Sequence, residues 1–90
     1  MRCLEKIPNG KLVAVDVIVS AGKVVSMKIT GDFFLYPEEQ ITALEAAFVG
    51  VSPSLSDSEL SDRIKQAIKN AELIGVSVDD LIRIFRKATL

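Results

Sequence analysis

The 90-residue chain contains no histidine and no tryptophan, and its only cysteine is Cys3. A lone cysteine can form no internal disulfide. Without histidine, the chain lacks the usual base for a serine or cysteine nucleophile and a common metal ligand. No apolar run approaches the roughly 20 residues that a transmembrane helix needs. We therefore expect a cytoplasmic protein with no metal site and no membrane partner.

The charges are nearly balanced, with 11 Lys and Arg against 12 Asp and Glu spread along the chain. A nucleic-acid-binding protein usually concentrates basic residues on one face, so we expect no nucleic-acid partner. Hydrophobic residues make up 49% of the chain, and the mean hydropathy is +0.34. That is high for a domain of this size, which buries only about 60–65% of its unfolded surface. The surplus indicates either a well-filled core or an apolar surface that binds a partner.

Two valine-rich segments predict neighbouring antiparallel strands. In "KLVAVDVIVS", residues 11–20, the valines at 13, 15, 17 and 19 share one face of a strand. In residues 23–30, Val25, Met27 and Ile29 alternate with polar residues. Upstream, residues 3–7 precede the turn-like sequence "PNGK" and predict a short edge strand.

The loop between the two valine-rich strands determines which residues lie opposite one another. A three-residue loop, Ser20 to Gly22 with Gly22 in the left-handed region, keeps the apolar residues of both strands on one face. It aligns Val17 with Val25, Val15 with Met27, and Val13 with Ile29.

The second face of the first valine-rich strand is also mostly apolar. If its valines face the helices, Asp16 points the other way together with Leu12, Ala14 and Ile18. A sheet with two apolar faces is normally covered on both sides, and the helices predicted below suffice for one. We therefore expect a partner to cover Leu12, Ala14, Asp16 and Ile18.

The remaining sequence predicts three helices. The first begins at Pro37 and ends at Gly50, the second follows Ser56 and stops near Gly75, and the third follows Ser77. An acidic residue three positions after each serine completes a capping box. Strands followed by helices indicate an α+β fold. We expect a single domain, residues 1–90, in which a small antiparallel sheet of two or three strands precedes three helices packed on one face.

No constellation of residues indicates catalysis. Neighbouring acids could perform acid–base chemistry, but each group lies in the first turns of a predicted helix, where the helix dipole favours acids. Cys3 is interpreted as a small buried or edge residue, and the cations of the last helix as a solvated face. The acids are Glu38, Glu39, Asp57, Glu59, Asp62, Asp79 and Asp80, and the cations are Arg83, Arg86 and Lys87.

The stretch "GDFF", residues 31–34, joins the strands to the first helix. Asp32 could be a reactive acid beside two aromatic rings, but its simpler role is to accept backbone N–H bonds at the corner. In an extended chain Phe33 and Phe34 point in opposite directions, so one ring enters the core and the other faces outward. We therefore consider Asp32, Phe33 and Phe34 candidates for contact with a partner.

The series "EKIPNGKL", "VDVIVSAGKVVSMKITGDFF" and "PEEQITALEAAFVG" resembles the small C-terminal accessory domain of lipoate-protein ligases, over essentially the whole chain. The resemblance implies a ligase that activates lipoate with ATP to lipoyl-adenylate and then transfers the lipoyl group to a lysine of an acyl-carrier domain. In that family a large catalytic domain holds the ATP and lipoate sites, and the accessory domain is needed chiefly for adenylation. The resemblance is carried most specifically by Gly10, Lys11, Gly22, Gly31, Asp32, Phe33, Phe34, Leu44, Glu45 and Gly50.

The large catalytic domain is absent from this chain. The resemblance therefore implies a non-catalytic small subunit of a split ligase, in a heterodimer with a catalytic large subunit. Lipoyl-acceptor domains of the E2 or H-protein type are then indirect partners. ATP, Mg and lipoate are used by the assembled ligase, and this chain alone is expected to bind no cofactor. Two alternatives stay open: a protein-binding adaptor unrelated to lipoylation, and an independent small-molecule binder.

Overall fold

A computed structural model describes residues 1–8 and 11–90. Residues 9 and 10 of the turn predicted at "PNGK", among them the family residue Gly10, lie outside the described residues. The strands are β1 (Arg2–Lys6), β2 (Leu12–Ser20), β3 (Lys23–Gly31), β4 (Phe34–Tyr36) and β5 (Glu72–Ile74). The helices are the 3₁₀-helix η1 (Glu38–Gln40), α1 (Ile41–Ala46), α2 (Asp57–Ala67) and α3 (Val78–Ala88). None of these helices is long and apolar enough to cross a bilayer.

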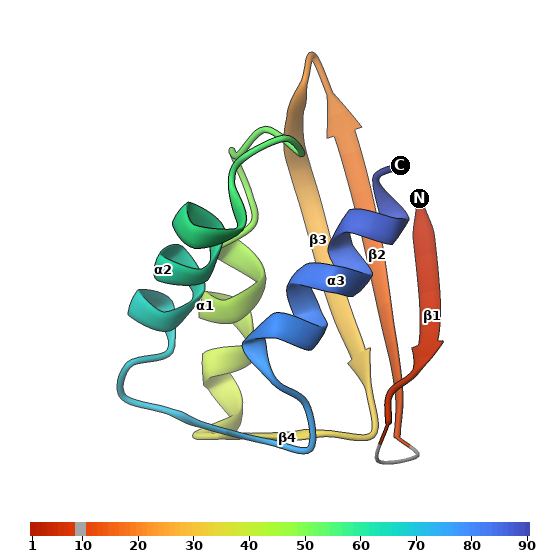
Figure 1. The fold of residues 1–90 in the computed structure, drawn as a ribbon. Helices are drawn as coiled ribbons and strands as arrows, with labels where there is room; N and C mark the ends of the chain where they lie inside the picture. The colour runs from red at the N-terminus through yellow and green to blue at the C-terminus, as the bar shows by residue number, and fades with distance from the viewer. Residues whose placement is uncertain (9–10) are drawn as a thin grey trace.

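The main sheet is antiparallel with the order β1-β2-β3, and the helices lie on one of its faces (Figure 1). Helix α3 packs across β1 and β2, α1 packs against β3, and α2 lies against α1 and α3. The predicted α+β fold, with a small antiparallel sheet and helices on one side, is confirmed. The predicted edge strand is also confirmed, as β1.

The turn between β2 and β3 has two residues, so the predicted three-residue loop is wrong. Ala21 and Gly22 both have positive φ, 52° and 76°, as the central residues of a type I′ hairpin turn do. Ser20 lies directly opposite Lys23 across the turn. The right-handed twist of the two strands favours this tight turn over a looser loop.

The register of β2 and β3 differs from the prediction as a consequence. A β-bulge leaves Val25 without a partner on β2. Val24 is 1% exposed and Val25 is 51% exposed, so Val24 takes the core position predicted for Val25. The bulge thus restores the inward alternation that a two-residue turn alone would have broken. The observed pairs are Val17 with Met27, Val15 with Ile29, and Val13 with Gly31.

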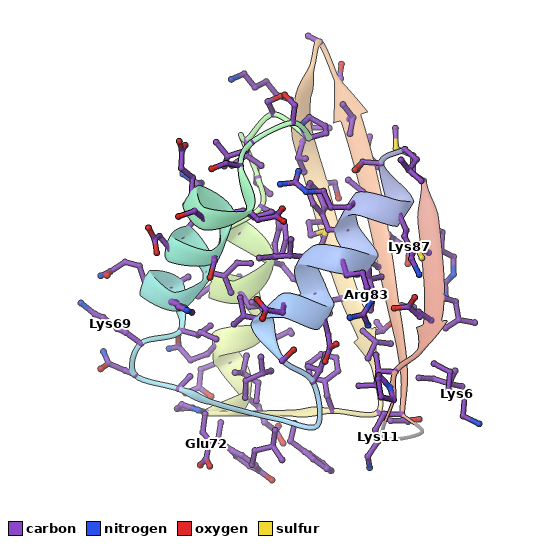
Figure 2. All side chains as sticks on the ribbon, in the orientation of Figure 1. Lys6, Lys11, Lys69, Glu72, Arg83 and Lys87 are labelled. Atoms are coloured by element: carbon purple, nitrogen blue, oxygen red, sulfur yellow. The ribbon has the colours of Figure 1, made fainter. Side chains whose placement is uncertain are left out.

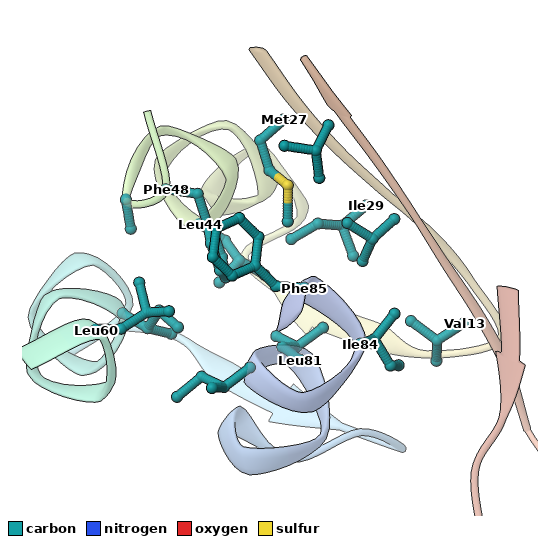
Figure 3. Packing of buried hydrophobic residues seen from close by; sticks show 14 of the residues in the cluster. Val13, Met27, Ile29, Leu44, Phe48, Leu60, Leu81, Ile84 and Phe85 are labelled. Carbon is teal, nitrogen blue, oxygen red and sulfur yellow. The ribbon is translucent and has the colours of Figure 1, made fainter. Parts of the chain in front are cut away.

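The hydrophobic core fills the space between the sheet and the three helices. Figure 3 shows Val13 and Ile84 on the sheet side of this space and Leu60 of α2 on its far side. The rings of Phe48 and Phe85 meet at its centre, with their centroids 5.1 Å apart. No polar or charged residue in the described parts of the chain is buried, so the core is apolar throughout.

A second, two-stranded sheet was not predicted from the sequence. Strand β4 pairs antiparallel with β5, and Leu35 lies opposite Leu73 on the side that faces the core. Helix α2 ends at Ala67 instead of continuing to the neighbourhood of Gly75, which leaves residues 72–74 free to form β5. The predicted length of the second helix was therefore wrong.

The helix starts agree with the sequence in part. Around Ser77, both bonds of the capping box with Asp80 form, each at 3.0 Å. The Ser56 hydroxyl accepts a bond from the Glu59 N–H at 3.2 Å, and this is the one bond of that predicted box that the described residues form. Pro37 is not the first helical residue, because it precedes η1 in an extended conformation.

Candidate partner-binding surfaces

The corner at residues 31–34 is built by the backbone and not by the Asp32 carboxylate. Gly31 has a φ of 146°, and a Cβ at this position would lie 2.3 Å from the carbonyl oxygen of Leu12. The Asp32 N–H donates to that same oxygen at 2.8 Å. The exposed Asp32 carboxylate accepts none of the hydrogen bonds recorded among the described residues. The expectation that it caps the turn is therefore wrong.

Phe33 and Phe34 point to opposite sides of the chain, as expected. Phe33 is partly buried and packs against the core, whereas Phe34 is 57% exposed. The Phe34 ring stacks on Tyr36, with 6.3 Å between ring centroids and 12° between planes. Across the β4–β5 ladder Phe34 faces Ile74, which is also exposed. We call Phe34, Tyr36 and Ile74 the aromatic surface.

A groove of about 420 Å³ lies beside the aromatic surface. It runs between the end of β3 and the start of α1, and its lining includes Gly31, Phe33, Phe34 and Ile41. The exposed rings thus border a recess that can receive side chains of a partner.

The face of the main sheet opposite the helices is uncovered (Figure 1). Residues directly opposite one another in a ladder share a face, and the register therefore defines this set. We call it the outer sheet face: Arg2, Leu4, Lys6, Leu12, Ala14, Asp16, Ile18, Ser26, Lys28 and Thr30. The prediction that Leu12, Ala14, Asp16 and Ile18 lie together on an uncovered face is confirmed.

Exposed apolar side chains lie on both sides of a charged row, Arg2–Asp16–Lys28, that crosses the outer sheet face. Leu4, Leu12 and Ile18 are 60%, 43% and 58% exposed. Ala14 is 3% exposed, because this short side chain lies between Leu4 and Thr30 in the sheet. The sequence pattern did not identify Leu4 as part of this face, since the register of β1 depends on its pairing with β2.

The cations of α3 do not form the solvated face that was expected. The Arg83 guanidinium bonds Glu5 of β1 and Asp80, both at 2.9 Å, and Lys87 also pairs with Glu5. Figure 2 shows Arg83 and Lys87 between α3 and β1. Hydrogen bonds from Lys87 and then Arg83 hold the pKa of Glu5 below its ordinary value. These ion pairs fasten the edge strand to the helix layer.

Arg86 connects α3 to the loop before α2. Its guanidinium binds Asp57 at 2.8 Å and also contacts the carbonyl oxygens of Pro53 and Leu55. Arg83, Arg86 and Lys87 border a hollow of about 400 Å³ along α3. Because each of these cations already has an acidic partner, the hollow is poorly suited to a phosphate group.

The other candidate reactive groups occupy structural positions. The Cys3 thiol is free and packs against the core. The paired acids lie in the first turns of η1, α2 and α3. In residues 1–8 and 11–90, no group of three or more His, Cys, Asp or Glu side chains could hold a metal ion. The free thiol and the paired acids thus contribute to the packing and the helix starts of the described residues.

Several residues that carry the family resemblance stabilise the fold. Leu44 is fully buried, and the Glu45 carboxylate accepts the Ile29 N–H of β3 at 2.8 Å. Gly50 has a φ of 87°, and its N–H donates to the Val24 carbonyl at 2.7 Å. The Lys11 carbonyl accepts the N–H of Ile7 at 2.8 Å. The role of Glu45 could not be read from sequence, because its partner is a backbone group on another element.

Comparisons with known proteins identify one family and one similar fold. Residues 4–85 match the model of the family described as "Bacterial lipoate protein ligase C-terminus". A search of curated proteins found no match. Among solved structures, the chain is similar to one from work on "an archaeal lipoylation system", "a bi-partite lipoate protein ligase and its E2 lipoyl domain from Thermoplasma acidophilum". The two chains are 24% identical with a TM-score of 0.71, over 96% of this chain and 98% of the other. At this identity the likeness establishes the fold.

Proposed function

The chain belongs to the family of bacterial lipoate protein ligase C-termini, and we propose that it is the non-catalytic small subunit of a split lipoate-protein ligase. With a separate catalytic large subunit it forms a heterodimer that uses ATP and Mg to activate lipoate to lipoyl-adenylate. The heterodimer then transfers the lipoyl group to a lysine of an E2 or H-protein type acceptor domain. The family match and the similarity in fold to a chain from work on a bi-partite ligase, over 96% of this chain, support the proposal.

The proposed contact with the catalytic subunit rests on the aromatic surface. Phe34 and Tyr36 are stacked on a strand that is paired with β5, and preordered rings lose little conformational entropy on binding. Aromatic residues that insert into recesses of a partner dominate the energy of many interfaces. The groove beside Phe34 can in turn receive a side chain of the partner. We assign the catalytic subunit to this surface, with Asp32 at its margin and Phe33 supporting it from the core side.

The proposed role of the small subunit is positional. Bound at the aromatic surface, it orders loops of the catalytic subunit and excludes water from the reactive lipoyl-adenylate. The positions of the charged residues support this role, because the paired acids begin helices and the α3 cations bind β1 and the loop before α2. The ATP, Mg and lipoate sites are therefore assigned to the catalytic subunit, and no catalytic residue to this chain.

Separate assays of the two half-reactions test the proposed function. Pyrophosphate release from ATP and lipoate is measured for the catalytic subunit with and without this chain. Lipoyl transfer from preformed lipoyl-adenylate to an acceptor domain is measured in parallel. We expect the chain to stimulate pyrophosphate release strongly and to have a weak effect on transfer at saturating acceptor. Equal pyrophosphate release without the chain would contradict the proposal and favour an adaptor unrelated to the ligase.

A further inference from the structure

We propose that the outer sheet face is a second docking surface, which binds the lipoyl-acceptor domain through an acidic face of that domain. The inference rests on the proposed function and extends it. The aromatic surface holds the catalytic subunit, and the outer sheet face receives the protein that is to be modified. The small subunit thus contributes to the recognition of the acceptor as well as to adenylation.

The outer sheet face combines exposed apolar side chains with exposed cations. Leu4, Leu12 and Ile18 are each more than 40% exposed. Lys6 lies directly opposite Leu12, and Lys28 lies in the charged row between Ile18 and Ala14; both lysines are exposed. Protein–protein interfaces combine apolar contacts with polar and charged groups in this way.

The charge of this face differs from that of the chain as a whole. The face carries three cations, Arg2, Lys6 and Lys28, and one carboxylate, Asp16, whereas the chain has 11 cations and 12 carboxylates. Asp16 pairs with Arg2 at 2.6 Å. In the described parts of the chain, no carboxylate lies within ion-pair distance of Lys6 or Lys28. The surface that complements this face therefore presents carboxylates.

The same charges disfavour a second copy of the chain as the occupant. A two-fold symmetric contact would place this face against itself, so two surfaces of the same net positive charge would meet. Like charges brought together at an interface cost several kcal/mol. A partner with acidic groups avoids this repulsion.

The outer sheet face and the aromatic surface point in different directions. Figure 2 shows Lys6 directed away from the helices at β1, whereas Glu72 lies at the base of the molecule beside β4. Glu72 is directly opposite Tyr36 in the β4–β5 ladder, so it marks the position of the aromatic surface. The two surfaces adjoin at Thr30, which lies on the outer sheet face and also lines the groove. We infer that both can be occupied at once, as required if an acceptor approaches while the catalytic subunit stays bound.

The composition of each surface matches the lifetime of the contact assigned to it. Contacts that depend on exposed charges associate quickly and weaken with salt, which suits an acceptor domain that leaves after each turnover. Stacked aromatic rings beside a recess suit a contact that persists between turnovers. The acceptor domain is therefore assigned to the basic outer sheet face and the catalytic subunit to the aromatic surface.

Charge reversal on the outer sheet face tests this inference in the assembled ligase. For the double variant Lys6→Glu/Lys28→Glu, we expect the KM for the acceptor domain to rise about tenfold. The kcat at saturating acceptor should change little. Pyrophosphate release without acceptor, and association with the catalytic subunit, should stay as in the unmodified chain. The KM of the unmodified ligase should also rise with ionic strength, more steeply than that of the variant.

A matched control reverses two lysines on the other side of the molecule. Lys65→Glu/Lys69→Glu makes the same change in net charge at exposed positions at the end of α2, and Figure 2 shows Lys69 far from Lys6. This control should leave the KM for the acceptor unchanged. An equal rise in KM for both double variants would overturn the inference, because the effect would then reflect net charge alone.

Direct binding separates this inference from the proposed function. The isotopically labelled chain is titrated with the acceptor domain, and we expect the NMR signals of Leu4 and Ile18 to shift. Shifts without any effect of the chain on adenylation would support acceptor binding while contradicting the proposed function. An unchanged KM in Lys6→Glu/Lys28→Glu, or loss of its association with the catalytic subunit, would overturn the assignment of this face to the acceptor.

Discussion

Alternate residues of β2 meet two different environments. Val13, Val15 and Val17 are at most 1% exposed beneath the helices, whereas Leu12 and Ile18 on the same strand are 43% and 58% exposed. All five side chains are aliphatic, so the residue type does not account for the difference. It arises because the helices cover only one face of the sheet (Figure 1). Part of the apolar surplus in the composition therefore lies on the outer sheet face, available for a partner, and not in the core.

Among substitutions on the two faces of the sheet, one in the core is expected to lower the free energy of unfolding most. Phe85→Ala removes a fully buried ring that contacts Phe48, and we expect a loss of about 3–5 kcal/mol in the free energy of unfolding. Ile18→Ala on the outer sheet face should lose less than about 1 kcal/mol, because its side chain is largely exposed. Urea denaturation of both variants measures the difference. Equal losses would show that the outer face is covered in the isolated chain.

A smaller effect is expected at the corner that carries the chain from the main sheet to the aromatic surface. Gly31→Ala places a Cβ against the Leu12 carbonyl oxygen and strains a φ of 146°, so we expect a loss of about 2–3 kcal/mol or more. Gly22→Ala is the matched control, because its Cβ meets no atom within 4 Å. It should lose only about 1–2 kcal/mol. The same denaturation assay compares them, and an equal cost at both sites would contradict the close packing at Gly31.

The ion pairs between β1 and α3 give a pH-dependent effect on the covered side of the sheet. Glu5→Gln removes the negative charge and one of the two carboxylate oxygens that accept the bonds from Arg83 and Lys87, and we expect a loss of about 1.5–2 kcal/mol at pH 7. Because the pKa of Glu5 is lower in the folded chain, its contribution is present above the ordinary glutamate pKa of about 4.3. The contribution is lost as the pH falls through the lowered value.

Unfolding free energies of the chain and the Glu5→Gln variant between pH 7 and pH 2 test this prediction. The difference between them should shrink toward zero at the acidic end. On the outer sheet face, Asp16→Asn breaks the exposed ion pair with Arg2 and should cost less than about 1 kcal/mol at pH 7. A difference for Glu5→Gln that stays constant over the whole pH range would contradict the linkage.

Local patterns predicted the parts of the fold that depend on near neighbours. The valine alternation predicted β2 and β3 because a sheet with one covered face needs an apolar residue at every second position. Ser77 predicted the start of α3, since its capping partner lies three residues away. The bulge at Val25 was missed because neither glycine nor proline marks it. The ion pairs of Arg83 and Arg86 were missed because their partners lie 78 and 29 residues away in the sequence.

The candidate surfaces could be predicted only in part, because they too depend on contacts between residues far apart in the sequence. The extended stretch at residues 33–34 was enough to predict that Phe33 and Phe34 diverge. Tyr36 and Ile74 were not identified, because they join Phe34 only through the pairing of β4 with β5. Strands of three residues contain too little alternation to be distinguished from loops, and this pairing joins segments far apart in the chain.

The affinity of the catalytic subunit for variants of the two surfaces tests the central claim most directly. That claim is that the catalytic subunit docks on the aromatic surface and leaves the outer sheet face open. For Phe34→Ala we predict that the dissociation constant rises at least about tenfold, or about 1.4 kcal/mol, with unchanged unfolding. For Lys6→Glu/Lys28→Glu it should stay within about twofold of the unmodified chain. The account is contradicted if the charge variant loses affinity while Phe34→Ala keeps it.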